Sequence, residues 1–180
     1  MATLETPRLI LRRWTLDDVP EAASIYGDPA TMQLFATGKT FTPAEVAASL
    51  AGVIAGYDDS CLGNYAVLHR ASGRILGHCG VHRSADPPIE AEVDWLIRRD
   101  GWRCGYATEA ALTVIASVFA SAEAVVISGV AHSENVPSIA LMRRLGMRYV
   151  RNQSRFDFDS VVYDITSDRF FATLEHPEPP

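Results

Sequence analysis

The sequence predicts an α/β fold in one domain. Its 180 residues, of which 48% are apolar and 21% charged, suit a single globular domain with a good core. Short strand patterns and helical patterns follow one another along the chain, separated by turn residues. One stretch, residues 90–119, combines a strand, a glycine-containing turn and an amphipathic helix. There is no linker, repeat or low-complexity segment, so we expect residues 1–180 to form that single domain.

The composition narrows the classes of function. The formal net charge of −6 argues against broad nucleic-acid binding and favours cationic partners such as amines and basic peptides. No apolar run is long enough to cross a bilayer, and the first residues lack the layout of a signal peptide. The three cysteines are an odd number at unpatterned spacing, which is typical of free thiols in a reducing compartment. We therefore expect a cytoplasmic protein with neither a membrane nor a nucleic acid as partner.

The first third of the chain predicts one strand followed by two helices. These elements span residues 8–14, 15–26 and 42–55. Thr15 or Asp17 is placed to cap the first helix, and Pro43 suits the first position of the second, where no N–H is needed. An Asp-Pro pair interrupts the chain between the helices, and residues 31–41 are predicted to form a loop or a short turn.

A hairpin is predicted next, with strands at residues 64–70 and 74–83 around an Ala-Ser-Gly turn. His78 and His82 fall on one face of the second strand. No third ligand lies at a convincing spacing, so we expect hydrogen-bonded or solvated histidines and no metal site. The Asp-Pro-Pro sequence at 86–88 predicts a turn.

The strand at residues 90–97 carries the most chemical information. Its even positions begin with Glu90, Glu92 and Asp94, whereas its odd positions are apolar, and a strand places these two sets on opposite faces. The three carboxylates line a cleft if the strand is central, and they are merely solvated if it lies at an edge. The helix that follows and the later strand at 124–131 indicate a central position, so we favour the cleft.

A turn containing Gly101 and Gly105 joins this strand to a helix. Apolar residues recur through residues 107–119 at the i, i+3, i+4 spacing of one helix face. The first turn of a helix has backbone N–H groups without partners and the positive end of the helix dipole, and glycine lets a phosphate approach the backbone. The stretch therefore predicts an anion site.

The last third of the chain predicts a strand, a capped helix and a terminal hairpin. These elements span residues 124–131, 135–146, 149–156 and 160–166. Asn135 is placed as the helix cap and Gly146 as its stop. Residues 175–180 are predicted to be a short disordered tail.

The anion loop resembles a known motif. Its sequence, Trp-Arg-Cys-Gly-Tyr-Ala-Thr-Glu-Ala from Trp102, is similar to the acetyl-coenzyme A (acetyl-CoA) loop of the GNAT N-acetyltransferases, with Gly105 and Ala107 at the last two fixed positions. Tryptophan at the first fixed position resembles the Rim-like branch, which contains acetylases of ribosomal-protein N-termini. It also means that no polar side chain at that position can be assigned to acetyl-CoA.

A second motif, at residues 135–147, resembles another GNAT signature. The matching residues are Asn135, Ser138, Leu141, Leu145 and Gly146. The opening residues 6–14 resemble the first strand of the Rim-like branch, so the resemblance covers about residues 4–172.

The resemblance implies a GNAT fold with a central mixed, twisted sheet flanked by helices and a core of about residues 4–172. It implies transfer of an acetyl group from acetyl-CoA, as co-substrate, to a primary amine such as the N-terminus of a protein or peptide. The residues implied to bind acetyl-CoA are Leu96, Ile97, Arg98, Arg103, Cys104, Gly105, Tyr106, Ala107, Thr108, Asn135 and Ser138. A monomer and a homodimer both remain open, as does the identity of the amine.

The resemblance also implies catalytic roles. Glu92 is the candidate base, directly or through a water, because the acidic position on this strand often serves so in similar enzymes. Many GNAT enzymes carry a tyrosine as general acid at the position of Met142, which cannot donate a proton. Some Rim-like enzymes instead use the serine at the position of Ser138, whose other interpretation is an ordinary serine in the first turn of a helix.

Three alternatives compete with a peptide acetylase. A small-molecule N-acetyltransferase acting on an amino acid, polyamine or antibiotic has the same motifs, and a non-catalytic acyl-CoA sensor accounts for the missing tyrosine. A dinucleotide-binding fold fits poorly, because its glycine spacing is absent and the acidic residue in range, Glu123, precedes the next strand.

Overall fold

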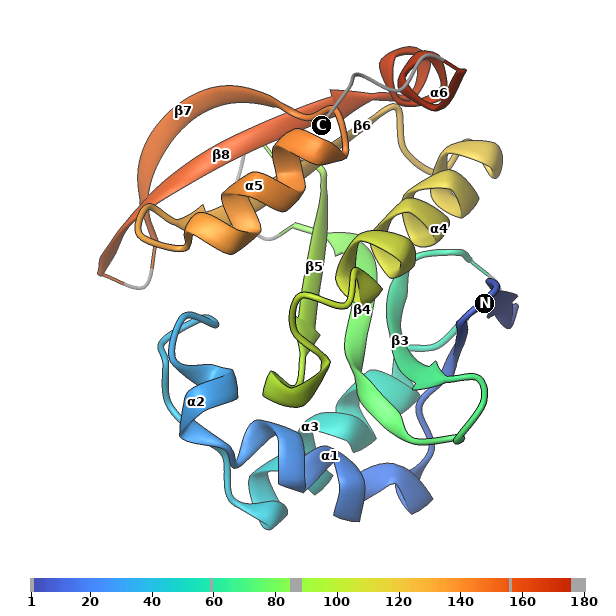
Figure 1. The fold of residues 1–180 in the computed structure, drawn as a ribbon, viewed down its shortest axis with the longest axis vertical. Coiled ribbons are helices and arrows are strands. Elements are labelled where there is room, and N and C mark those ends of the chain that lie inside the picture. The colour runs from blue at the N-terminus through green and yellow to red at the C-terminus, as the bar shows by residue number, and fades with distance from the viewer. Residues whose placement is uncertain (1, 59, 85–88, 156, 176–180) are drawn as a thin grey trace.

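The computed structural model describes residues 2–58, 60–84, 89–155 and 157–175. Within these residues the chain forms an eight-stranded sheet in the order β1-β2-β3-β4-β5-β6-β8-β7 (Figure 1). The strands are β1 (Leu4–Glu5), β2 (Leu9–Arg13), β3 (Gly63–His69), β4 (Ile75–Arg83), β5 (Ala91–Ile97), β6 (Val126–His132), β7 (Arg148–Arg155) and β8 (Phe158–Thr166). This mixed α/β architecture confirms the predicted fold class.

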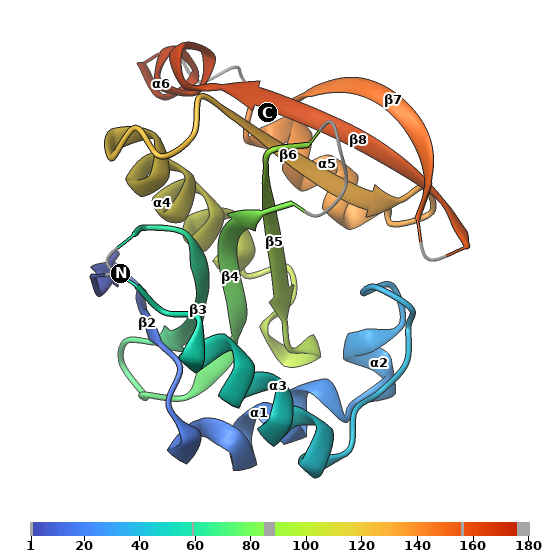
Figure 2. The same ribbon diagram turned by 180° about the vertical axis from the view of Figure 1, so that it is seen from behind.

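The centre of the sheet holds the feature that positions the site. Among the described strands, β5 and β6 are the one parallel pair, and every other neighbouring pair is antiparallel. Their register covers only Glu92 opposite Ser128 and Val93 opposite Gly129, and the two strands then diverge (Figures 1 and 2). The second half of β5 therefore has a partner strand on its β4 side only, among the described residues.

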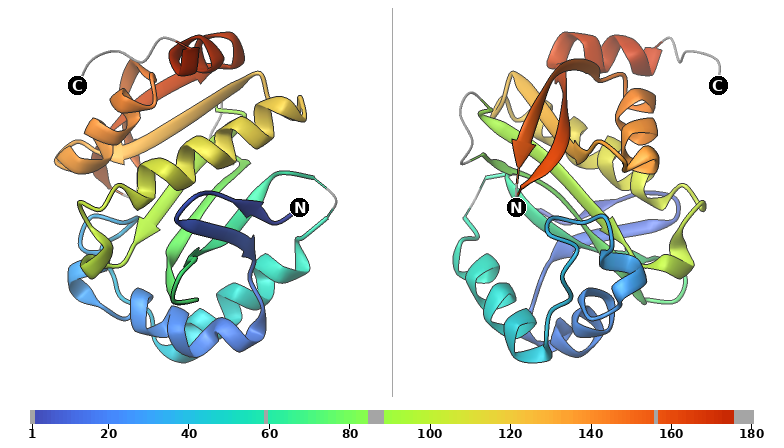
Figure 3. Two further views of the ribbon diagram at one scale, coloured as in Figure 1. Left: turned by 45° about the vertical axis from the view of Figure 1, so that its right-hand side comes forward. Right: turned by 90° about the vertical axis from the view of Figure 1, so that its left-hand side faces the viewer.

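Helices cover both faces of the sheet (Figure 3). They are α1 (Val19–Tyr26), α2 (Pro29–Met32), α3 (Pro43–Ala55), α4 (Tyr106–Ala120), α5 (Val136–Arg144) and α6 (Ser167–Glu175), with short 3-10 helices at Leu16–Asp18 and Arg99–Gly101. One buried cluster joins α1, α2 and α3 to the sheet through residues such as Ile25, Met32 and Leu50. A second cluster joins α4, α5 and α6 to the sheet through Val114, Met142 and Phe170.

The predicted helix starts are largely confirmed by their caps. Thr42 and Glu45 form a capping box at α3 with Pro43 in its first turn, and Asn135 caps α5. Thr15 caps the 3-10 helix rather than α1, and the residue that precedes α1 is Asp18, not Asp17.

Three expectations are wrong or incomplete. The predicted loop at 31–41 begins inside α2, because the Asp28 side chain accepts hydrogen bonds from the N–H groups of Ala30 and Thr31 and so caps a short helix. The sequence did not predict the edge strand β1 or the helix α6. Phe170 explains α6, because it is fully buried against Phe119 of α4, with ring centroids 5.6 Å apart. The predicted turn at 86–88 and residues 176–180 of the predicted tail lie outside the described residues, whereas Glu175, also assigned to that tail, is the last residue of α6.

Within the described ranges, none of the helices has the length and apolar character needed to cross a membrane.

Candidate functional site

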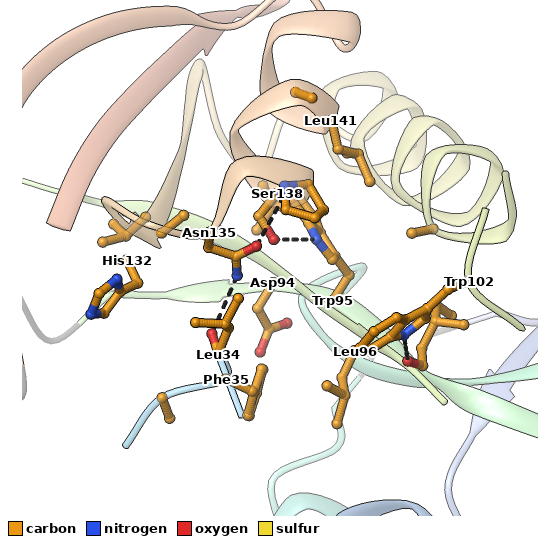
Figure 4. A pocket seen from close by; sticks show the side chains of 18 of the residues that line it. Leu34, Phe35, Asp94, Trp95, Leu96, Trp102, His132, Asn135, Ser138 and Leu141 are labelled. Carbon is orange, nitrogen blue, oxygen red and sulfur yellow. Dashed lines mark hydrogen bonds between the residues drawn. The ribbon is translucent and has the colours of Figure 1, made fainter. Parts of the chain in front are cut away.

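A pocket of about 690 Å³ lies where β5 and β6 diverge (Figure 4). Its lining comes from β4, β5, the start of α4, α5, β6, β7, β8 and the segment after α2. The volume is in the range of ligand pockets, and parallel strands that separate at their carboxyl ends commonly hold such sites.

The start of α4 forms one wall of this pocket. Gly105 is the residue before the helix, with φ of 79°, and no side chain caps the helix there. The N–H groups of Tyr106, Ala107 and Thr108 belong to the first turn and have no partner within the helix. All three residues line the pocket, as Arg103 does. A helix of 15 residues that begins directly after a glycine, with no side-chain cap, offers backbone donors to an anion, so the loop fits the pyrophosphate of acetyl-CoA.

Contacts from other elements hold this loop in place. The Trp102 indole N–H donates to the Ile97 carbonyl oxygen at 2.6 Å, and the Arg8 guanidinium donates to the Cys104 carbonyl oxygen at 2.8 Å. Arg8 also pairs with Glu109 of α4 at 2.6 Å and covers the ring of Tyr106. Arg8, the residue just before β2, thus fixes the start of α4.

Loss of the Glu109 charge is expected to weaken this clamp. Burial opposes ionisation, but hydrogen bonds from Thr6 and Arg8 outweigh it and lower the pKa of Glu109 from 4.5. Because the pKa is depressed in the folded state, the stabilisation is complete above about pH 4.5 and is lost as pH falls through the folded-state pKa. Glu109→Gln should cost about 1–2 kcal/mol of unfolding free energy at pH 7.

Urea denaturation at a series of pH values measures this effect. Glu5→Gln is the matched control, because Glu5 pairs with Arg70 at the surface and should change stability little. Equal losses for the two variants at pH 7, or a Glu109→Gln loss that persists at acid pH, would contradict the clamp.

Two carboxylates of β5 reach the pocket. Glu92 and Asp94 are both in its lining, whereas Glu90 is exposed. Glu92 is buried, and its Oε1 is contacted by the Arg155 guanidinium of β7. Asp94 lines the same pocket as Ser138, Leu34 and Phe35 (Figure 4).

The start of α5 forms the opposite wall. Asn135 Oδ1 accepts a hydrogen bond from the Ser138 N–H at 3.1 Å, and its Nδ2 donates to the Leu34 carbonyl oxygen at 3.2 Å. The Trp95 indole N–H donates to Ser138 Oγ at 3.4 Å (Figure 4). Asn135 therefore ties α5 to the segment after α2, and Ser138 is oriented toward β5.

Most of the residues predicted from the sequence gather at this pocket. Its lining includes Glu92, Leu96, Ile97, Arg103, Gly105, Tyr106, Ala107, Thr108, Asn135 and Ser138. Arg98 and Cys104 lie outside that lining. The Arg98 guanidinium pairs with Asp100 at 2.7 Å, and the Cys104 side chain is exposed with its thiol 3.5 Å from the Trp102 carbonyl oxygen. Met142, at the position of the absent tyrosine, is fully buried in the core.

Several lining residues carry no sequence signal. Phe35, His132, Arg155 and Phe158 come from four separate elements of the chain and belong to no motif, and Arg144 is not among the matching residues of the second motif. His78 is hydrogen-bonded, as expected, with its Nδ1 at 2.7 Å from the Tyr26 hydroxyl. In the described ranges, no group of three or more His, Cys, Asp or Glu side chains is arranged to hold a metal ion.

Comparison with known proteins gives a consistent picture. A family model described as an acetyltransferase (GNAT) domain matches residues 8–148. The uncharacterized N-acetyltransferase p20 of Bacillus licheniformis is 26% identical over 152 residues, which are 82% of this chain and 83% of that protein.

Solved structures share the fold. An acetyltransferase of the GNAT family from Bacillus anthracis superposes with a TM-score of 0.80 at 20% identity, covering 93% of this chain and 99% of its own. The ribosomal-protein-S5-alanine acetyltransferase of Vibrio fischeri has a TM-score of 0.77 at 13% identity, covering 94% and 99%.

Proposed function

The chain belongs to the acetyltransferase (GNAT) domain family and is an acyltransferase, and we propose that it acetylates a primary amine with acetyl-CoA bound in the pocket between β5 and β6. The observation that carries this proposal is the uncapped start of α4 at Gly105, which opens onto that pocket. Acetyl-CoA supplies the acetyl group as an activated thioester. The first-turn N–H groups of Tyr106, Ala107 and Thr108 bind its pyrophosphate, and Arg103 lies beside them.

The acceptor we propose first is the N-terminal amine of a protein or peptide. The likeness of the Trp102 loop to the Rim-like branch supports it, together with the fold shared with a ribosomal-protein acetyltransferase. A free small-molecule amine is the second candidate, because the carboxylates of the pocket suit any cationic acceptor. Acetyl transfer to peptides with free N-termini, measured beside a panel of free amines, separates the two.

Two side chains take the proton-transfer roles in this proposal. Glu92 removes a proton from the amine, directly or through a water, and Ser138 Oγ donates one to the departing sulfur. Both residues line the pocket from opposite sides, on β5 and α5. Arg155 pairs with Glu92, so the role of Glu92 as a base has to be tested together with this ion pair.

Acetyl-CoA is expected to stabilise the folded protein. At about 100 times its dissociation constant it should add about 2.7 kcal/mol, which corresponds to a rise in melting temperature of roughly 5–10 °C for a chain of this size. Thermal denaturation with acetyl-CoA, and with acetate as the control, measures the shift. An unchanged melting temperature at saturating acetyl-CoA would contradict the proposal.

A further inference from the structure

The two pocket carboxylates of β5 are held in different ways. Both oxygens of Glu92 are engaged, since Arg155 contacts Oε1 and the Ser84 hydroxyl lies 3.4 Å from Oε2. Asp94 forms no ion pair with an arginine or lysine among the described residues, and its Oδ1 is buried without a hydrogen-bond partner there. Its side chain is still 23% exposed. A partly exposed carboxylate that is short of donors is a binding element for a group with several N–H donors.

His78 contacts the Asp94 carboxylate, and Tyr26 is hydrogen-bonded to His78. Asp94 Oδ2 is 3.5 Å from His78 Nε2, and the Tyr26 hydroxyl is 2.7 Å from His78 Nδ1. Burial raises the pKa of Tyr26, so its hydroxyl keeps its proton and forms a neutral hydrogen bond with His78 Nδ1. The other ring nitrogen of His78, Nε2, then faces Asp94 Oδ2. Burial of Asp94 favours its neutral form, but His78, His82 and the Asn64 side chain outweigh burial and lower its pKa, so the carboxylate is ionised at neutral pH.

The surroundings of Asp94 are aromatic. Asp94 and Phe35 line the main pocket and also a smaller cavity of about 150 Å³ beneath α1 and α3. Among the described residues, the lining of that cavity has no arginine or lysine and includes the aromatic side chains of Trp14, Tyr26, Phe35 and Phe41. Aromatic faces beside one carboxylate attract a cation and repel an anion.

We propose that Asp94 binds the acceptor as a protonated aliphatic amine at the junction of the two cavities, with His78 and Tyr26 as positioning residues. The inference rests on the proposed acetyl transfer and narrows its acceptors to amines that are ammonium ions near neutral pH. Aryl amines, which are neutral there, lose the charge interaction. Asp94 acts in recognition, and the removal of the proton remains a separate step.

The first experiment removes the charge of the Asp94 side chain and keeps its shape. In Asp94→Asn, the KM for the aliphatic acceptor used best by the wild type should rise about 10- to 100-fold, the range for a lost hydrogen bond to a charged group. The kcat and the KM for acetyl-CoA should change less than about threefold. Glu90→Gln is the matched control, because it removes an exposed carboxylate four residues earlier in the chain, outside the pocket lining. Its KM should stay at the wild-type value.

The second experiment uses two isomeric competitors of that acceptor. 2-Phenylethylamine is an ammonium ion at pH 7.5, and 4-ethylaniline is neutral with the same atoms. The wild type should bind 2-phenylethylamine at least about tenfold more tightly, and Asp94→Asn should lose most of that preference. In His78→Phe, which keeps a ring but loses both ring nitrogens, the KM for the acceptor should rise with little change in kcat.

The outcomes separate this inference from the proposed function. Acetyl transfer by the wild type without a preference for the ammonium competitor overturns the role of Asp94 and leaves acetyl transfer standing. An unchanged amine KM in Asp94→Asn overturns it in the same way. Absence of transfer to every amine and peptide overturns the proposed function itself. The wild-type competitor ratio needs no variant, so it decides the inference even if Asp94→Asn is poorly folded.

Discussion

Replacing Gly105 with valine is expected to abolish the binding of acetyl-CoA. Gly105 precedes the first turn of α4 with φ of 79°, and an added Cβ would already lie 3.3 Å from Arg8 Nη2. A branched side chain there stands beside the N–H groups that we assign to the pyrophosphate. We expect the dissociation constant to rise at least about 100-fold, which corresponds to about 2.8 kcal/mol. Isothermal titration calorimetry with acetyl-CoA measures it.

Backbone strain is the competing explanation, and the chain offers a control for it. Gly73 also has positive φ, at 70°, but a Cβ added there meets nothing within 4 Å and the residue lies outside the pocket lining. Gly73→Val should therefore lower the free energy of unfolding by about 1–2 kcal/mol, as backbone strain in Gly105→Val should, and leave the affinity for acetyl-CoA unchanged. Wild-type affinity in Gly105→Val would remove the loop from the acetyl-CoA site.

The elements that build this loop could be predicted because their signals are local. The alternation along β5, the glycine before α4 and the apolar stripe of α4 all lie within about thirty consecutive residues. The cap of α5 by Asn135 is equally local, and the structure has it in the expected place. Periodicity and capping chemistry report on neighbours in sequence, so they identify such elements well.

The parts that escaped prediction depend on contacts between distant segments. Helix α6 packs through Phe170 on Phe119, and no local pattern indicates that partner. The side chains around Glu92 and Asp94 also come from segments that are distant in sequence. Glu92 meets Arg155 from β7, and Asp94 meets His78 from β4, so strand order decides which carboxylate is paired. Alternation places both on one face and cannot distinguish them.

Glu92→Gln and Ser138→Ala are expected to reduce acetyl transfer with different pH dependences. Removal of a general base commonly costs about 10²–10⁴ in rate. Glutamine keeps the size of Glu92 but cannot accept the amine proton, so the deficit should shrink as pH rises and more of the amine is already neutral. Ser138→Ala removes a proton donor to the departing sulfur, so its deficit should show little recovery at high pH. The measurement is kcat/KM against pH for both variants and the wild type.

The Arg155 contact supplies the control that separates catalysis from structure. If Glu92 serves only to hold Arg155 on β7, then Arg155→Gln breaks the same pair and should lose as much activity as Glu92→Gln. If Glu92 accepts the proton, Arg155→Gln leaves the carboxylate in the pocket and should retain more activity at every pH. Melting curves of both variants are needed, because breaking a buried ion pair costs about 3–5 kcal/mol. Wild-type rates in Glu92→Gln across the pH range would take Glu92 out of the mechanism, and the pocket would then keep Asp94 as the one β5 carboxylate, among the described residues, available to the amine.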